Sequence, residues 1–272
     1  MSLTDASAFG PRVRASHAAR ALLPGLALAL IGLLSAPAGA RAEELPVKAE
    51  PVKPITAPKA VIELFTSQGC SSCPPADKLM GELAARSDVL ALTLAVDYWD
   101  YLGWKDTLAK HGHSLRQKAY AHMRGDGKMF TPQAVVNGRV MTIGSDRVAL
   151  ERALESSPSP ALPVSVATRG DRVTVDIGAM PGAAKAEVWL CPVASRMGVE
   201  IGRGENEGAR VVYHNVVRGW VKLGTFEGTP VRFEAPVHRA PGEGIDAVAV
   251  FVQTGSSTEP GAVLGAALQP LD

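Results

Sequence analysis

The apolar positions of this chain form one long run near the amino terminus and then shorter runs whose period changes along the chain. Residues 21–34 (ALLPGLALALIGLL) are an apolar segment, and the small residues 38–40 follow it. Residues 41–58 are rich in Pro, Lys and Glu and show no apolar period. We therefore expect a signal peptide over residues 1–40 and an extended Pro-rich linker over residues 41–58.

Residues 59–157 alternate between strand-like and helix-like patterns. The continuous apolar runs are typical of strands buried on both faces, and Asn137-Gly138 suits a type I′ hairpin turn between two such runs. The order of the elements predicts an α/β domain whose first two strands are parallel. The expected strands are 60–65, 89–96, 133–136 and 139–143, and the expected helices are 76–86, 105–124 and 145–154.

Residues 160–272 show a different pattern, with short alternating runs and no convincing helix. This pattern is typical of an all-β sandwich. We therefore predict an α/β domain over residues 59–157, followed by an all-β sandwich domain over residues 160–272. The strand-like runs of the second domain are 164–168, 172–177, 186–190, 210–213, 230–233 and 246–253.

The charges of the chain argue against binding to nucleic acid. Lys and Arg number 28 against 27 Asp and Glu, and no basic cluster breaks this balance, so we expect no binding to nucleic acid.

The apolar segment 21–34 is shorter than the 20 or so residues of a spanning helix and contains Pro24-Gly25. An uncleaved membrane anchor is the alternative, but a cleaved signal fits better. We expect a periplasmic or secreted protein with no stable membrane insertion after cleavage.

The chain contains three cysteines, of which Cys70 and Cys73 lie together in the segment FTSQGCSSCPPAD. A bridge between them would add little stability as a staple, since closing a four-residue loop contributes about 2 kcal/mol and a 100-residue loop nearly 5 kcal/mol. A zinc site needs four ligands, and the remaining cysteine, Cys191, is far away in the sequence. We therefore predict no metal site, although a copper site with a remote histidine stays open.

Thiol–disulfide exchange fits the pair best. A CxxC segment between a strand and a helix places one sulfur near unpaired N–H groups and the positive end of the helix dipole, which lowers the pKa of that thiol. The intervening Ser71 and Ser72 can donate hydrogen bonds but carry no charge. Pro74 suits the first helical position, so Cys73 could be the helix cap, which would weaken the case for Cys70 as the low-pKa thiol.

A second segment strengthens this interpretation, because Thr131-Pro132-Gln133 leads into the predicted hairpin. The order of these motifs resembles the thioredoxin superfamily, in which a CxxC after the first strand faces a cis-proline. The segments ELFTSQGCSSCPPAD, VDYWDYLGW, TPQAVVNG, GRGENEG and YHNVVR are similar to a family of exported bacterial thioredoxin-like proteins known only as a domain of unknown function.

The resemblance implies a thioredoxin-like α/β domain followed by a β domain, but it brings no established reaction. It implies that the Thr131–Pro132 bond is cis, and that Thr131 and Gln133 present their backbone to an extended substrate. The chain departs from thioredoxin at Gly69, where thioredoxin has a tryptophan before its first cysteine.

Two further residues are candidates for supporting roles. A buried Glu63 could accept the proton of the resolving cysteine, although simple exposure at a strand start is equally compatible with the sequence. Trp99 belongs to a cluster of four aromatic residues that could wall the site or bind substrate, with core packing as the more ordinary use. Cys191 is most simply a small buried apolar residue, and a regulatory partner of Cys70 is the alternative.

The predicted function is therefore that of an exported thiol–disulfide oxidoreductase. Cys70 would attack a substrate disulfide, and Cys73 would resolve the mixed disulfide. The expected partners are a protein thiol or disulfide substrate and a redox partner, and we expect no cofactor. Two alternatives stay open: a cell-envelope binding module in which the CSSC pair is a structural disulfide, and a copper-handling protein.

Overall fold

The computed structural model describes residues 43–47 and 51–272. The predicted signal peptide lies outside the described residues. Within them, no helix combines the length and the apolar character needed to cross a membrane.

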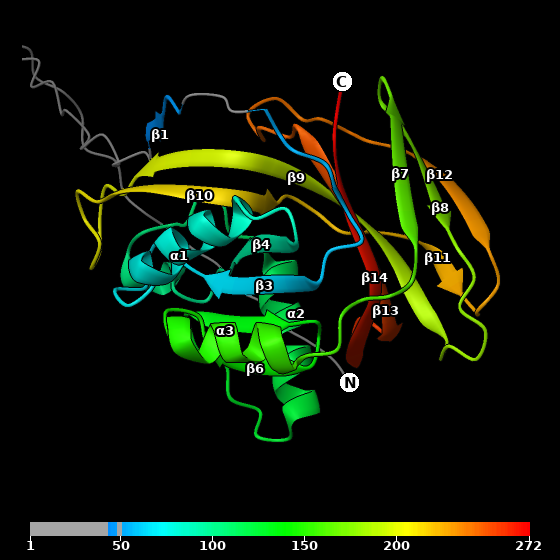
Figure 1. Cartoon of the computed structure of the whole chain (residues 1–272). Coiled ribbons are helices and arrows are strands. Elements are labelled where there is room, and N and C mark those ends of the chain that lie inside the picture. Colours follow the sequence, from blue (N-terminus) through cyan, green and yellow to red (C-terminus); the bar gives the residue numbers. More distant parts are fainter. Residues whose placement is uncertain (1–42, 48–50) are drawn as a thin grey trace, which may run out of the picture. The chain divides into compact units, whose positions relative to one another are not determined.

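The described part of the chain contains three α-helices, one short 3-10 helix and fourteen strands (Figure 1). The helices are α1 (Pro74–Ala84), α2 (His111–Arg124) and α3 (Arg147–Ser156), and the 3-10 helix is η1 (Asp100–Leu102). The strands are β1 (Glu43–Leu45), β2 (Ile55–Thr56), β3 (Ala60–Thr66), β4 (Val89–Ala95), β5 (Gln133–Val136), β6 (Val140–Ile143), β7 (Val164–Arg169), β8 (Arg172–Ile177), β9 (Ala186–Glu200), β10 (Arg210–Val217), β11 (Val221–Phe226), β12 (Val231–Pro236), β13 (Ala247–Gly255) and β14 (Pro260–Pro270).

One mixed sheet runs through both halves of the chain, and the predicted fold class is therefore wrong. Its strand order is β2-β14-β13-β9-β10-β4-β3-β5-β6, with β1 and β11 paired to β9. The junction is a parallel pairing of β10 with β4, at Val216 and Thr93. Strands account for 41% and helices for 17% of the described residues. A mostly β protein with one large mixed sheet replaces the expected α/β thioredoxin-like domain followed by a β sandwich.

Several local predictions are confirmed. Strands β3 and β4 are parallel, and β5 and β6 form a hairpin around Asn137 and Gly138, whose φ angles are 50° and 69°. Both residues of a type I′ turn require positive φ, which asparagine and glycine adopt at little cost. Helix α2 begins at His111, later than expected, and Asp146 caps α3 by accepting a hydrogen bond from the Ala149 N–H.

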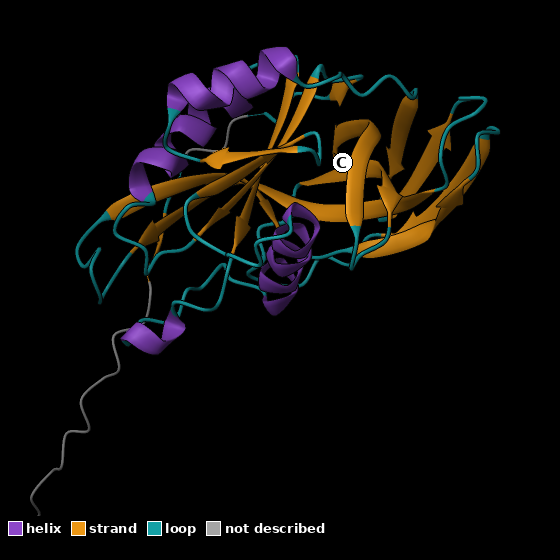
Figure 2. Ribbon diagram, turned by 90° about the horizontal axis from the view of Figure 1, so that it is seen from below, coloured by secondary structure: helices purple, strands orange, loops and turns teal. Residues whose placement is uncertain are grey.

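Helices α1 and α3 cover the β10-β4-β3-β5-β6 part of the large sheet, while the far end of the molecule consists of strands and loops (Figure 2). Strand β3 is buried on both faces because alternate side chains enter different cores. Ile62 and Leu64 pack with residues of α1 and α3, whereas Phe65 packs with Tyr120 of α2. Helices α1 and α3 therefore lie on one face of this region, and α2 lies on the other.

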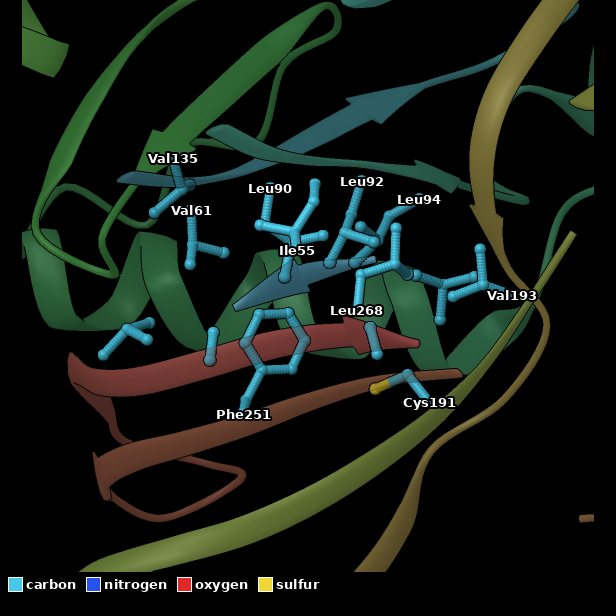
Figure 3. Packing of buried hydrophobic residues seen from close by; sticks show 14 of the residues in the cluster. Ile55, Val61, Leu90, Leu92, Leu94, Val135, Cys191, Val193, Phe251 and Leu268 are labelled. Carbon is cyan, nitrogen blue, oxygen red and sulfur yellow. The ribbon is translucent and has the colours of Figure 1, made fainter. Parts of the chain in front are cut away.

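The core that contains Tyr120 also includes buried residues of β9, β13 and β14. Figure 3 shows Cys191 among apolar residues of this core, including Val193, Phe251 and Leu268. Cys191 is a free, fully buried thiol, and burial raises its pKa well above the ordinary value. A separate three-stranded sheet, β12-β8-β7, buries one face in a third core together with β9 and β13.

Two asparagines join distant strands where the backbone turns left-handed. The Asn137 side chain accepts a hydrogen bond from the Val61 N–H at 2.7 Å. Asn215, with φ of 48°, interrupts the pairing of β10 with β9 and donates through Nδ2 to the Ala91 carbonyl of β4 at 2.9 Å. Asn215 thus links β10 to β4 at the place where the two halves of the sheet meet.

Candidate functional site

Cys70 and Cys73 form a disulfide between the end of β3 and the start of α1. Cys73 is the N-cap residue, and Pro74 and Pro75 occupy the first two helical positions. Prolines have no N–H group, so this helix start offers the sulfurs its dipole but few free donors. The relative exposure of Cys70 is 2% and that of Cys73 is 0%, whereas Ser71 and Ser72 between them are exposed.

Three of the predicted site residues gather beside Cys70. The Ser72 hydroxyl donates to the Thr131 carbonyl at 3.4 Å and lies 3.5 Å from the Cys70 Sγ. Trp99 Nε1 donates to the Thr131 Oγ1 at 2.8 Å, so Trp99 helps to hold the loop opposite the disulfide. The Thr131–Pro132 bond is cis, as expected. A Cβ atom added at Gly69 would lie 3.1 Å from the Trp99 Cβ, so only glycine fits easily under this tryptophan.

Gln133 lies inside the sheet. It begins β5, pairs with Phe65 on one side and Ile143 on the other, and is fully buried. Its side-chain oxygen accepts a hydrogen bond from Gln117 Nε2 at 2.9 Å. Gln117 also donates to the Phe130 carbonyl, so the two glutamines tie α2 to the loop that carries Thr131.

The segment before Cys70 is held by hydrogen bonds from two distant loops. Trp104 Nε1 donates to Gln68 Oε1 at 2.9 Å, and the Gln68 N–H donates to Asp106 Oδ2 at 2.8 Å. Asn206 Nδ2 donates to the carbonyls of both Gln68 and Cys70, each at 2.9 Å. The segment GRGENEG, whose role the sequence did not reveal, therefore reaches the backbone of the first cysteine.

We expect Asn206→Ala to make the disulfide easier to reduce, because the substitution removes both bonds between this loop and the Gln68–Cys70 backbone. The measurement is the rate at which dithiothreitol reduces the native protein, and we expect a several-fold increase. Glu205→Ala, an exposed change in the same loop, is the control. Equal rates for Asn206→Ala and the wild type would show that this loop does not limit access to the disulfide.

Two buried carboxyl groups lie near the disulfide. Asp77 follows Cys73 by four positions on α1, so the two side chains share one face of the helix start. Burial raises the pKa of Asp77 to about 8, although the hydrogen bond that Thr66 Oγ1 donates to it acts in the opposite direction. Burial likewise raises the pKa of Asp106 to about 6, against the hydrogen bonds that it accepts from backbone N–H groups.

Glu63 was a candidate acceptor for the proton of the resolving cysteine, but its carboxylate has other partners in the structure. Glu63 is buried and forms an ion pair with Arg116 of α2. The Tyr120 hydroxyl also donates to Glu63, at 2.6 Å. Burial alone would lower the pKa of Arg116, but the Glu63 carboxylate holds that pKa above its ordinary value. Asp77, the last residue of the motif FTSQGCSSCPPAD, is the buried acid that sequence reasoning missed.

Three histidines have partners or packing that the structure defines. His113 Nδ1 lies 2.9 Å from the Ala95 carbonyl, and burial lowers the pKa of His113 to about 4, so its ring is neutral near pH 7. His111 pairs with Asp97 at the surface, and the His214 ring packs against Gly81. Among the described residues, no group of three or more His, Cys, Asp or Glu side chains is arranged to hold a metal ion.

A comparison with known protein families identifies the family of this chain. Residues 61–253 match the family described as "Protein of unknown function (DUF1223)", and the chain belongs to this family. A crystal structure of protein AGR_C_4864 from Agrobacterium tumefaciens, a structural genomics target, is similar with a TM-score of 0.68 and 33% sequence identity. The match covers 78% of this chain and 94% of the Agrobacterium chain. No curated protein matches.

Proposed function

We propose that this protein is a thiol–disulfide oxidoreductase that uses Cys70 and Cys73. The observation that carries the proposal is the disulfide at the start of α1, with the Thr131 loop opposite it and the buried Asp77 carboxyl on the side of Cys73. The position of the CxxC pair between a strand and a helix, with the Thr131 loop opposite it, supports a relationship of this site to that of the thioredoxin superfamily.

From the oxidised form, a substrate thiolate attacks the Cys70 Sγ and breaks the Cys70–Cys73 bond. The Cys73 sulfur leaves as a thiolate and takes a proton from the Asp77 carboxyl, which is largely protonated at pH 7. A second substrate thiolate then attacks the substrate sulfur of the mixed disulfide and releases Cys70. The substrate loses two electrons and the protein gains them. In reverse, the Cys70 thiolate attacks a substrate disulfide, and Asp77 takes the proton of Cys73 as Cys73 resolves the mixed disulfide.

We further propose that the protein works outside the cytosol, in the periplasm or secreted, with a protein thiol or disulfide as substrate and a separate redox partner. The export features of residues 1–40 and the presence of a disulfide support this location.

The burial of both sulfurs favours a second candidate, a binding module whose disulfide is structural. The deciding measurement is the reduction potential of the pair, by glutathione titration with maleimide mass-tagging. The oxidoreductase predicts a reversible midpoint between about −120 and −270 mV, and a midpoint below about −300 mV would favour the structural bridge. Cys191→Ser is the matched control, since Cys191 is buried in a different core and its loss should leave the midpoint unchanged.

Single cysteine variants test the order of attack. Cys73→Ser should accumulate a stable mixed disulfide with a glutathionylated peptide, because Cys70 can attack but nothing resolves the adduct. Cys70→Ser should form no such adduct if Cys70 is the attacking thiol. An adduct on Cys70→Ser alone, seen by intact-mass measurement, would reverse the two roles.

A further inference from the structure

A cleft of about 500 Å³ lies between α2 and the strands of the second half of the chain, away from the disulfide. Trp189 of β9 and Trp220, which follows β10, form one wall, with their rings edge to face at 6.2 Å. Trp220 also stacks on the buried Phe251 at 5.7 Å, which fixes its orientation. The volume is in the range of sites that hold one small molecule.

The cleft combines this apolar wall with positive charge. Arg116 lines it with 8% of its side chain exposed, and the Arg116 guanidinium lies 4.4 Å from the Trp220 ring centroid. Lys118 and His122 of α2 line the cleft as well, and no Asp or Glu is among the described residues that do so. Glu63 is paired with Arg116 and compensates its charge, and Glu187 of β9, the strand that carries Trp189, is paired with Lys222.

One polar atom of the wall has no partner. The Trp220 Nε1–H is enclosed and donates to no acceptor within the described part of the chain. Buried indole N–H groups usually find an acceptor, so an unpartnered one in this wall is unusual.

We propose that this cleft binds a small apolar carboxylate, with its hydrocarbon part against the tryptophans and its carboxylate near Lys118. Aliphatic and aromatic acids share this chemistry. The apolar walls supply most of the affinity, and the cations select the sign of the ligand charge. None of the residues that line the cleft takes part in the proposed exchange reaction, so this inference is independent of the proposed function.

The test is a titration of the purified chain with decanoate, followed by intrinsic tryptophan fluorescence, and with 2-naphthoate, followed by calorimetry. We expect saturable binding of at least one of the two acids, and the stronger binder identifies the aliphatic or aromatic class. Decyltrimethylammonium, which has a similar chain and the opposite charge, should bind at least tenfold more weakly than decanoate.

Two exposed residues of α2 provide a matched pair of variants. Leu115 is 54% exposed and lines the cleft, whereas Met123 is 50% exposed and does not. Leu115→Glu should weaken binding of the acid about tenfold, and Met123→Glu should leave it unchanged, with both chains remaining folded by circular dichroism. Lys118→Glu should weaken binding about fivefold, with Lys78→Glu on α1 as its control. Equal binding of the anionic and cationic probes, equal effects of the Leu115 and Met123 variants, or the absence of saturable binding would overturn the proposal.

Discussion

Asp77→Asn is expected to stabilise the protein at pH 7 by about 4 kcal/mol. The Asp77 pKa is raised from 3.8 to about 8 in the folded protein, so the unfolded chain releases this proton at lower pH than the folded one. The free energy of unfolding therefore falls as the pH rises from about 4 to 8. Asparagine stays neutral and can still accept the hydrogen bond of Thr66. Urea denaturation of the two proteins between pH 4 and 8 measures the difference.

The gain should vanish near pH 4, where the carboxyl is protonated in the folded protein and half-protonated in the unfolded chain. Asp88→Asn is the matched control with the opposite sign, because the hydrogen bond from Arg86 lowers the pKa of the more exposed Asp88. A difference between Asp77→Asn and the wild type that does not change with pH would contradict the raised pKa.

The same substitution should slow thiol–disulfide exchange by about a hundredfold if Asp77 transfers the proton of Cys73. Under the proposed function, the most stabilising single change at this site is therefore also a damaging one. Single-turnover reduction of the disulfide by a peptide dithiol measures the rate. An unchanged rate would remove Asp77 from the mechanism and leave the stability prediction intact.

The second large effect is expected at the buried pair of Glu63 and Arg116. Glu63→Leu should lower the free energy of unfolding by about 3–5 kcal/mol, because it leaves the Arg116 guanidinium buried without its counter-charge. Replacing both residues with leucine should recover a large part of the loss, since no unpaired charge then remains. Urea denaturation of the two single variants and the double variant gives the coupling free energy between the residues.

The surface pair Asp176 and Arg232 provides the control. Both side chains are largely exposed, so Asp176→Ala should change stability by no more than about 1 kcal/mol. If Glu63→Leu cost no more than Asp176→Ala, the buried pair would contribute nothing beyond an ordinary surface contact.

The local elements of the fold could largely be predicted from the sequence, because the spacing of apolar side chains and the turn residues act over a few positions. Strand β3, helix α1 and the β5–β6 hairpin lie where these patterns place them. Pro74 made the preceding Cys73 a candidate helix cap, and Cys73 is the cap. Strands β11 and β14 were not predicted, although β14 follows a Ser- and Thr-rich turn and pairs along most of β13.

The predicted fold class was wrong for a physical reason. Apolar periodicity reports which faces of a strand are buried, but not which strand lies beside it. Strand β10 could bury its side chains in a separate sandwich or beside β4 with the same sequence. The bond from Asn215 to the Ala91 carbonyl and that from Thr93 to the His214 carbonyl join residues more than a hundred positions apart.

For the candidate site, the sequence alone specifies the chemical groups that are present: two thiols between a strand and a helix, two intervening hydroxyls and a threonine–proline loop. The surroundings of these groups depend on the tertiary structure. The packing buries Asp77 in the first turn of α1, pairs Glu63 with Arg116, and brings Asn206 to the Cys70 carbonyl from 136 positions away. Burial and long-range hydrogen bonds arise from the packing of distant segments, and no local pattern in a single sequence encodes that packing.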